Sequence, residues 1–437
     1  MNSYFADGDQ AVNAMVDVAT GAVHQITQHT QFEGYPLISP DGTKVAYWYP
    51  YNGDPVSQND IFVTDLAGGN GNDVTAEDID SNVQRAIWMP DSKSLIVSGH
   101  KGTDAALWLK PLGARATRLQ LGLVQPTQSF WLDASVSGTG ALAFTGSEPH
   151  HPVELYYMAS VRSAPLRLTH YNDNLAALDQ GRVEAGAWNG PDGFDEDGVV
   201  TYPPNYDAGK VYPLVLVIHG GPNSASITSY SLFNQYLASR GYIVFNPNYR
   251  GSDNLGNRYW RAIAADAGDG PGRDVMAGVA ALQQRVKIDP KRIGVSGWSY
   301  GGYMTTWLIG HYHSWRVAVA GAAVTNAVDE YALADNGVGW RYQFGGSPYV
   351  GNNITKYREQ SPVTYAWNVT TPTLLLSDTR DSRVPITQSY EFFRALRDRG
   401  TTVRFFAYPV AGHFPGDPVR ARDVYRRWSG WLDQYLR

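Results

Sequence analysis

The stretch Gly297-Trp298-Ser299-Tyr300-Gly301, followed by Gly302, decides how the C-terminal part of this chain folds. It comes directly after an apolar segment, 292–296, that predicts a β-strand, and before a stretch, 303–309, that predicts a helix. G-x-S-x-G between a strand and a helix is typical of a nucleophile elbow, a sharp turn that exposes the serine hydroxyl above a sheet. Glycines are needed there because bulkier side chains would collide with the neighbouring strand or helix. The pattern makes Ser299 the predicted nucleophile.

The residues around this turn alternate between strands and helices from about residue 188 onward. Nearly continuous apolar segments are typical of parallel strands that are buried on both faces. Strands that alternate with helices indicate a parallel α/β sheet, so we predict an α/β domain over residues 188–437. The predicted strands are 212–218, 242–245, 292–296, 373–377 and 403–408, and two of the predicted helices are 273–286 and 388–399.

A serine nucleophile needs a general base, and the base needs a group that orients it. With a G-x-S-x-G turn, the order along the chain is serine, acid, histidine. His413 lies in a loop after the last predicted strand and is the candidate base, because His311 and His313 lie too close to the turn in sequence. Asp378 and Asp381 both follow the preceding strand, and spacing alone leaves both open as the acid.

An oxyanion hole needs N–H donors that face the negative charge developing on the substrate. One candidate is the backbone N–H of Tyr300, directly after the nucleophile. The others belong to Gly220 and Gly221, in the loop His219-Gly220-Gly221-Pro222 that follows the first strong strand. Glycines in such a loop allow the backbone to approach a substrate closely.

Residues 1–187 show a different pattern, in which short apolar runs and turns repeat along the chain. Ser39-Pro40-Asp41-Gly42 and Met89-Pro90-Asp91-Ser92 each precede a strand, Ser137-Gly138-Thr139-Gly140 starts a third copy, and 11–27 is an incomplete one. A period of about 47–50 residues with several strands per copy is typical of propeller blades. We predict a partial or small β-propeller of about four blades, with a generic β-sandwich as the alternative.

Five motifs of the sequence together resemble the prolyl oligopeptidase family of serine peptidases, and its acylaminoacyl-peptidase-like branch in particular. The resemblance covers residues 188–437 closely, and the repeat agrees with the N-terminal propeller of the family. It implies an α/β-hydrolase domain at 188–437, preceded by an all-β, partial or small β-propeller domain at 1–187. In the family, a propeller of seven or eight blades caps the site and restricts it to short peptides. The motifs are Gly297-Trp298-Ser299-Tyr300-Gly301-Gly302-Tyr303, His219-Gly220-Gly221-Pro222, Asn248-Tyr249-Arg250-Gly251-Ser252, Asp381-Ser382-Arg383-Val384-Pro385 and Gly412-His413.

The resemblance implies that Asp381 is the acid of the triad. Asp378 then stands where the family usually has glycine, and a second carboxylate near the site would raise the pKa of the triad acid. The sequence also departs from dipeptidyl members of the family, which bind a free amino terminus through a Glu-Glu pair. No Glu-Glu occurs in this chain, which argues against a dipeptidyl aminopeptidase.

The resemblance also implies substrate-binding residues. Arg383 corresponds to an arginine with which related acylaminoacyl peptidases hold the substrate backbone. A hydrophobic pocket for the residue before the cleaved bond would draw on Val324, Tyr331 and Val384.

These residues predict a serine hydrolase that cleaves short peptides or acylaminoacyl bonds. Ser299 attacks the acyl carbon, His413 takes and returns the proton, and Asp381 orients the imidazole. The alternative is a carboxylesterase that uses the same triad on small acyl esters, because a short propeller would admit other substrates and esters tolerate looser positioning. A binding protein with an inactive hydrolase domain is a third hypothesis, which the intact motifs argue against.

Composition and charge argue against several classes of partner for this chain. It has 437 residues, a net charge of -6 and no dense basic segment, so we expect no nucleic-acid partner. The absence of cysteine excludes disulfides and thiolate metal sites, and we expect neither a metal nor a cofactor. No apolar run reaches the roughly 20 residues that span a bilayer, and no signal-peptide pattern opens the chain, so we expect no membrane partner and a cytoplasmic location. Unpaired strand edges of a partial propeller invite pairing, so we expect a homo-oligomer.

Overall fold

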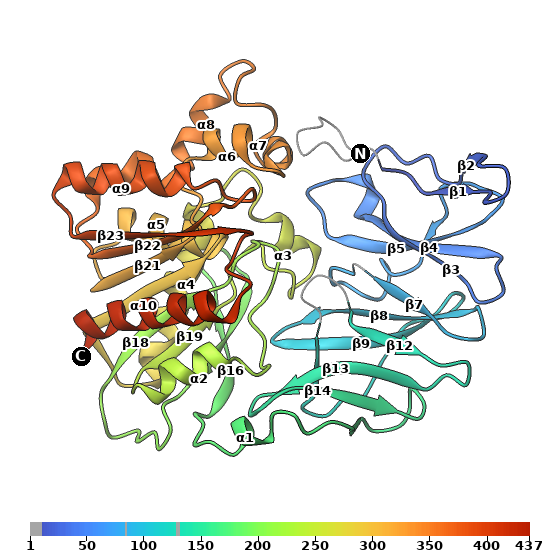
Figure 1. Cartoon of the computed structure of the whole chain (residues 1–437), viewed down its shortest axis with the longest axis horizontal. Helices are drawn as coiled ribbons and strands as arrows, with labels where there is room; N and C mark the ends of the chain where they lie inside the picture. The colour runs from blue at the N-terminus through green and yellow to red at the C-terminus, as the bar shows by residue number, and fades with distance from the viewer. Residues whose placement is uncertain (1–10, 84, 128–131) are drawn as a thin grey trace.

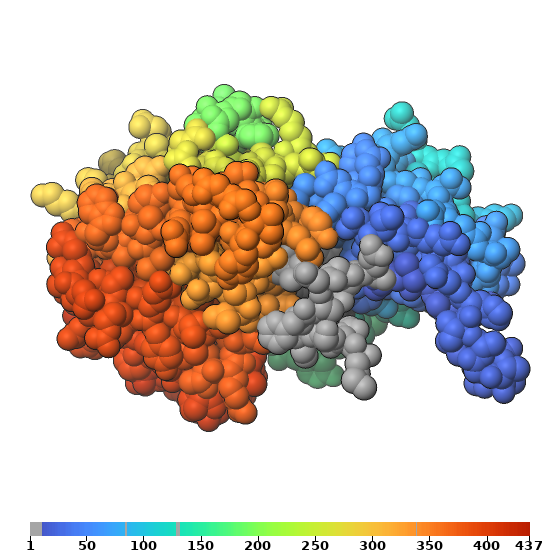
Figure 2. All heavy atoms as spheres, turned by 90° about the horizontal axis from the view of Figure 1, so that it is seen from above, coloured from blue at the N-terminus to red at the C-terminus, as the bar shows by residue number. Residues whose placement is uncertain are grey.

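The structure is a computed structural model that describes residues 11–83, 85–127 and 132–437. The described residues form two parts that lie side by side (Figure 1). The N-terminal part, on the right of Figure 1, is built of antiparallel sheets, and the C-terminal part contains one large sheet with helices on both faces. Seen from above, the molecule is elongated, with the N-terminal sheets at one end (Figure 2).

The large sheet has eight strands in the order β16-β17-β19-β18-β20-β21-β22-β23. The strands are β16 (Val183–Asn189), β17 (Asp195–Thr201), β18 (Tyr212–Ile218), β19 (Ile243–Pro247), β20 (Ile288–Trp298), β21 (Val317–Gly321), β22 (Thr373–Arg380) and β23 (Val403–Ala411). From β19 to β23 all neighbouring strands are parallel, whereas β17 is antiparallel to both β16 and β19. The parallel arrangement is as predicted, while the antiparallel edge and β21 are absent from the predicted strands.

Helices cover both faces of this sheet. The helices of the described chain are α1 (Asp173–Ala176), α2 (Leu232–Ser239), α3 (Asn257–Arg261), α4 (Asp269–Arg285), α5 (Tyr300–His311), α6 (Ala327–Leu333), α7 (Trp340–Phe344), α8 (Ile354–Glu359), α9 (Thr387–Arg399) and α10 (Pro418–Leu436), with 3-10 turns η1 (Tyr51–Gly53), η2 (Gly337–Gly339) and η3 (Pro362–Asn368). Two of them belong to the N-terminal part: η1 lies between β4 (Lys44–Pro50) and β5 (Asn59–Asp65), and α1 contacts β14 (His151–Met158). Alternate residues of a strand point to opposite faces. Leu216 of β18 therefore packs in a core with α4, α5 and α9, whereas Val215 packs in a second core with α2 and α10. Among the described residues, no helix is both long enough and apolar enough to cross a membrane.

The N-terminal part consists of three stacked antiparallel sheets and the short pair of β1 and β2. The strands are β1 (Ala14–Val16), β2 (Val23–Gln25), β3 (Gly34–Ile38), β4 (Lys44–Pro50), β5 (Asn59–Asp65), β6 (Asn72–Asp73), β7 (Ala86–Trp88), β8 (Ser94–Lys101), β9 (Asp104–Pro111), β10 (Thr117–Arg118), β11 (Gln125–Pro126), β12 (Ala134–Val136), β13 (Leu142–Glu148), β14 (His151–Met158) and β15 (Leu166–Arg167). The three sheets are β3–β6, β7–β10 and β11–β15. Val97 of the second sheet packs with Ile61 of the first, and its neighbour Ile96 packs with Phe144 of the third. The sheets are the blades of a β-propeller: within the described residues there are three, with the β1–β2 pair as the incomplete copy.

The repeated Pro-Asp motif forms the hairpin turn of the first two blades. Asp41 Oδ1 accepts the N–H of Thr43 at 3.1 Å, and Asp91 Oδ1 accepts the N–H of Lys93 at 2.9 Å. Such carboxylate contacts replace water at the free N–H groups of a turn. The backbone N–H of Asp41 also donates to Ser92 Oγ at 3.0 Å, so the turns of the two blades contact each other.

The chain passes from the blades to the large sheet through α1 and β16. β16 begins at Val183, before the boundary predicted at 187/188, and it pairs with β17 along its whole length. Strand pairing therefore places residues 183–187 in the large sheet, and the finer division into domains stays a prediction.

Candidate active site

Ser299 lies between the end of β20 and the start of α5, as the sequence predicts. Its backbone φ is 61°, in the left-handed region that is strained for residues with a side chain. Neighbouring backbone requires the glycines of this turn: a Cβ on Gly297 would lie 2.5 Å from the carbonyl carbon of Gly301, and a Cβ on Gly301 would lie 2.1 Å from the oxygen of Ile218. These close approaches hold Ser299 at the carboxyl edge of the parallel strands.

Asp381 and His413 come from the segments after β22 and β23 and form a hydrogen-bonded pair. His413 Nδ1 donates to Asp381 Oδ2 at 2.7 Å, and the side chains are 32% and 1% exposed, respectively. The other oxygen of Asp381 accepts the backbone N–H groups of Arg383 at 2.8 Å and Val384 at 3.0 Å. The carboxylate is thus held by its own loop, and it orients the imidazole so that Nε2 faces away from it.

Ser299 and His413 line the same cleft, which has a volume of about 610 Å³. Nε2 of His413 is buried and has no hydrogen-bond partner among the described residues, so the Ser299–His413 hydrogen bond is not formed in this structure. In unliganded enzymes this bond is often long or poorly aligned and tightens when substrate binds. The loop of His413 is held by Trp298, whose Nε1 donates to the His413 carbonyl at 2.6 Å. A larger cavity of about 710 Å³ lies among the blades and contains none of the predicted site residues.

The candidate oxyanion donors lie around Ser299. Gly220 and Gly221 line the cleft, and a Cβ on Gly220 would lie 3.1 Å from the Cβ of Ser299. The N–H of Tyr300 is in the first turn of α5, where no earlier helical carbonyl is available to accept it. The glycine loop and the start of α5 both lie next to Ser299, so their backbone N–H groups stay the candidate donors.

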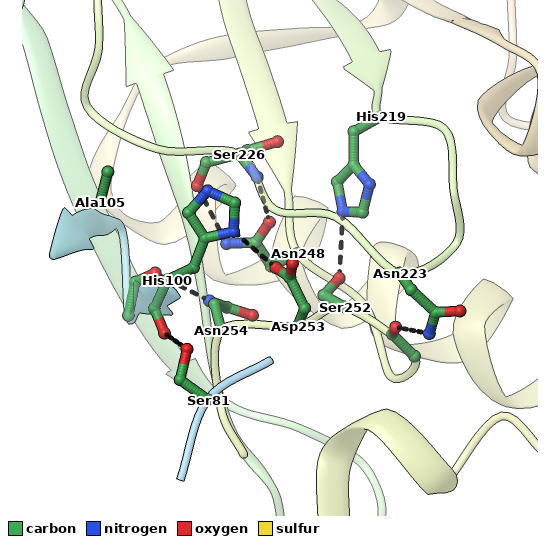
Figure 3. Close-up of polar contacts among 12 residues, drawn as sticks. Ser81, His100, Ala105, His219, Asn223, Ser226, Asn248, Ser252, Asp253 and Asn254 are labelled. Atoms are coloured by element: carbon green, nitrogen blue, oxygen red, sulfur yellow. Dashed lines mark hydrogen bonds and ion pairs between the residues drawn. The ribbon is translucent and has the colours of Figure 1, made fainter. Parts of the chain in front are cut away.

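His219 supports the glycine loop through both of its ring nitrogens. Nδ1 lies 2.8 Å from the Gly220 carbonyl, and Nε2 lies 3.0 Å from Ser252 Oγ, a contact that Figure 3 shows. The ring stacks on Tyr249, whose hydroxyl donates to the His219 carbonyl at 2.8 Å. Burial lowers the pKa of His219 to about 4, so the ring is neutral near pH 7. Two of the sequence motifs thus meet to position the loop beside Ser299.

The blades form the opposite wall of the cleft. His100 of β8 pairs with Asp253 of the α/β part, with 2.7 Å between Nδ1 and Oδ1 (Figure 3). Asp253 is the only carboxylate among the described residues that line the cleft. The wall otherwise presents mainly amide and hydroxyl groups. They include Asn82, Ser98, Gln125, Thr127 and Ser147.

Of the predicted substrate-binding residues, only Arg383 lines the cleft. It is half exposed, and its Nε donates to Asp335 Oδ1 at 2.6 Å. Val324 and Val384 are buried in the core of the α/β part, and Tyr331 packs against that core. The structure therefore brings Arg383 to Ser299 and His413, but it does not place the three apolar residues in the cleft wall.

Asp378, the alternative acid, lies inside β22. Neither of its carboxylate oxygens has a hydrogen-bond partner among the described residues. Of the two carboxylates that spacing leaves open, Asp381 is the one that contacts His413.

The sequence analysis missed the pair of His100 and Asp253, as well as the amide and hydroxyl side chains of the blade wall. Asp253 directly follows the motif Asn248-Tyr249-Arg250-Gly251-Ser252, and extending that motif by one residue would have included it. His100 carries no comparable signal, because it reaches the cleft from a blade that is distant in sequence. Among the described residues, no group of three His, Asp or Glu side chains is arranged to hold a metal ion.

Comparison with known proteins gives related sequences over most of the chain. Residues 228–437 match the model of the prolyl oligopeptidase family. Dipeptidyl-peptidase 5 of Porphyromonas gingivalis is 30% identical over 433 residues, which cover 96% of this chain and 62% of that protein. The acylamino-acid-releasing enzyme of Mus musculus is 29% identical over 250 residues, which cover 56% of this chain and 34% of that protein. The match thus spans less than two thirds of each relative's length.

Solved structures show the same architecture. The acylaminoacyl peptidase of Pyrococcus horikoshii matches with a TM-score of 0.83 at 22% identity, covering 95% of this chain and 65% of that one. This likeness supports a β-propeller followed by an α/β-hydrolase fold. The family itself rests on the sequence match: residues 228–437 of this chain correspond to the domain that defines the prolyl oligopeptidase family.

Proposed function

We propose that this chain is a serine peptidase that cleaves short peptides or acylaminoacyl bonds through an acyl-enzyme on Ser299. One observation carries the proposal: His413, which bonds to Asp381 with 2.7 Å between Nδ1 and Oδ2, lines the cleft that also contains Ser299 on its strained turn. The family domain over residues 228–437 supports peptide cleavage.

The reaction follows from the roles that these atoms can take. Ser299 Oγ attacks the acyl carbon while His413 Nε2 accepts the hydroxyl proton, and Asp381 stabilises the imidazolium that forms. The N–H of Tyr300 and the glycine loop stabilise the oxyanion. His413 returns the proton to the leaving amine and then activates the water that releases the acyl group.

We infer from the cleft that the preferred substrate has a blocked or uncharged amino end. The one described carboxylate that lines the cleft, Asp253, is paired with His100, so a protonated amine finds no free anionic partner there. Arg383 is the group that we propose for holding the substrate backbone. The relatives differ on this point, because one is named a dipeptidyl-peptidase and another an acylamino-acid-releasing enzyme.

The test is a comparison of kcat/KM for an N-acetylated aminoacyl anilide, its free-amine counterpart, a free dipeptidyl anilide and a short-chain p-nitrophenyl ester. Preference for the blocked anilide supports the proposal in full. Preference for the dipeptidyl anilide would show instead that the cleft binds substrates with a free amino terminus. Turnover of the ester alone would contradict a peptidase function.

Ser299→Ala is the decisive variant. We expect it to lower kcat/KM by roughly 10⁴-fold or more, because the nucleophile is lost, and to abolish covalent labelling by a fluorophosphonate probe. Ser239→Ala is the matched control, because Ser239 is exposed on α2 and bonds only to its own helix. Near-normal activity of Ser299→Ala would refute the assignment of the nucleophile.

A further inference from the structure

Asp378 is a buried carboxyl beside the catalytic pair that the mechanism above does not use. Its side chain is 0% exposed, and neither oxygen has a hydrogen-bond partner among the described residues. Burying a carboxylate without partners is costly unless the group takes a proton or faces a cation. Asp378 lies three residues before Asp381 in the sequence, and its backbone carbonyl accepts the N–H of Asp381 at 3.4 Å.

The charges that act on Asp378 come from three groups. Burial and the negative charge of Asp381 raise the pKa of Asp378 to about 7, with a smaller contribution from Asp417, whereas the charge of His413 lowers it. Its neighbour across the strand pair, Tyr408, directs its hydroxyl to Asp423 at 3.1 Å and leaves Asp378 unpaired. His413 is thus the one cation among these groups that can compensate an ionised Asp378.

We propose that Asp378 is a second carboxyl of the Asp381–His413 pair, which carries a proton while His413 is neutral and, once ionised, stabilises the imidazolium of His413. This proposal rests on the proposed function, because it assigns His413 the role of general base. Asp378 is a positioning residue: its carboxylate bonds to none of the reacting groups and acts on His413 through its charge.

The proton transfer fixes the direction of the effect. When Ser299 attacks, its hydroxyl proton moves to His413 Nε2, and the ring becomes a cation between Asp381 and the substrate. An ionised Asp378 lowers the free energy of that cation, and a protonated Asp378 does not. The same charge is present in the resting enzyme, so the activity of wild type should begin at higher pH than that of a variant without Asp378.

The first test is the pH dependence of kcat/KM in wild type and Asp378→Asn, which keeps the shape of the side chain and removes its charge. We expect the acid limb of the variant to move to lower pH by roughly one unit. Asp378→Gly, which removes the side chain, should move it in the same direction. An acid limb that stays in place in both variants would overturn the proposal, even if their overall rates fall.

Glu330→Gln is the matched control. Glu330 is also buried, and burial together with Asp381 raises its pKa well above the usual range, but His413 is not among the charges that act on it. We therefore expect its acid limb to coincide with that of wild type. A shift equal to that of Asp378→Asn would show that any buried carboxyl near Asp381 has this effect, and would overturn the specific role of Asp378.

The second test does not depend on catalysis. A carboxyl with a raised pKa in the folded state binds its proton more tightly there than in the unfolded chain, so its contribution to stability falls as pH rises through about 7. Asp378→Asn should therefore raise Tm relative to wild type more at alkaline pH than at acid pH. A difference in Tm that does not change with pH would overturn the proposal. If Ser299→Ala retained activity while this Tm result held, the proposed function would fail and the buried proton site would stand.

Discussion

The contacts around Gly301 leave no room for a single additional methyl group. A Cβ at this position would lie 2.1 Å from the oxygen of Ile218 and 3.0 Å from that of His219, and both are backbone atoms that cannot turn aside. Gly301→Ala should therefore lower the free energy of unfolding by about 1–3 kcal/mol and displace Ser299. Thermal unfolding and kcat/KM measured together check both effects.

Gly430→Ala is the control for this prediction. Gly430 lies inside α10, and a Cβ there would have no neighbour within 4 Å. Because alanine is the better helix former, this variant should gain about 0.5–1 kcal/mol and keep its activity. Equal stability of the two alanine variants would contradict the steric account of the turn.

At the residue scale, the sequence predicts a group better when its role depends on backbone geometry than when it depends on side-chain contacts. The G-x-S-x-G pattern is enough to place Ser299 on its turn, because only glycine fits there. Asp378 and Asp381 could not be separated by spacing, because both follow the same apolar segment. The structure separates them since β22 continues to Arg380, which leaves Asp378 inside the strand and Asp381 in the loop.

Among the elements, the end of β20 is tied to the loop after β23 by one side chain. Trp298 Nε1 donates to the His413 carbonyl at 2.6 Å, and the indole packs edge-on against Phe414. Trp298→Phe keeps most of the apolar contact and removes the donor, so the His413 loop loses its anchor. We expect kcat to fall by about 10- to 100-fold, because small displacements of a catalytic group are costly.

Trp431→Phe is the matched variant. Trp431 is buried in the core beneath α10, and its Nε1 has no hydrogen-bond partner among the described residues. Any loss of stability in this variant should leave kcat unchanged. If both variants lowered kcat equally, the effect would come from loss of core volume and not from the bond to His413.

Most of the strands with an apolar burial pattern were predicted, although β21, which is apolar and buried along its whole length, was missed. β17 was missed because it begins Asp195-Glu196-Asp197, which reads as a loop, although Glu196 and Asp197 are buried. Their partners come from other elements: Trp188 Nε1 donates to Glu196 Oε2 at 2.7 Å, and Asn248 Nδ2 donates to Asp197 Oδ1 at 2.6 Å. Such compensation depends on the finished fold and leaves no local pattern.

On the scale of the whole molecule, the sequence predicts the two kinds of architecture but not how they meet. The blade repeat and the strand–helix alternation each reflect contacts within one part. The contacts between the two parts include backbone hydrogen bonds, such as that from Gly102 N–H to the Asn254 carbonyl at 3.0 Å. Many residue types can form such a bond, so the sequence does not predict it. The expected homo-oligomer stays a prediction, which light scattering at micromolar concentration can test.

The His100–Asp253 pair joins the two parts at the cleft, and its contribution should depend on pH. Burial opposes the charged imidazole, but the charge and hydrogen bond of Asp253 outweigh burial, so the pKa of His100 is raised. Stabilisation by a histidine with a raised pKa is fully present below its unfolded value of about 6.5 and is lost as pH rises through the folded value. The parts should therefore hold together most firmly in mildly acid solution.

His100→Gln tests this, because glutamine retains a donor for Asp253 but carries no charge. At mildly acid pH we expect it to lower the free energy of unfolding by about 3 kcal/mol, since it leaves a buried carboxylate without its cation, and the difference from wild type should shrink as the pH rises. In this variant, hydrogen exchange at the N–H of Gly102, which bonds across the join between the two parts, should be faster than in wild type at mildly acid pH.

His170→Gln is the control, because His170 and Asp173 form an exposed pair at 3.1 Å that should contribute little to stability. A constant stability difference between His100→Gln and wild type across pH would mean that the pair joins the two parts through its hydrogen bond alone, without the charge.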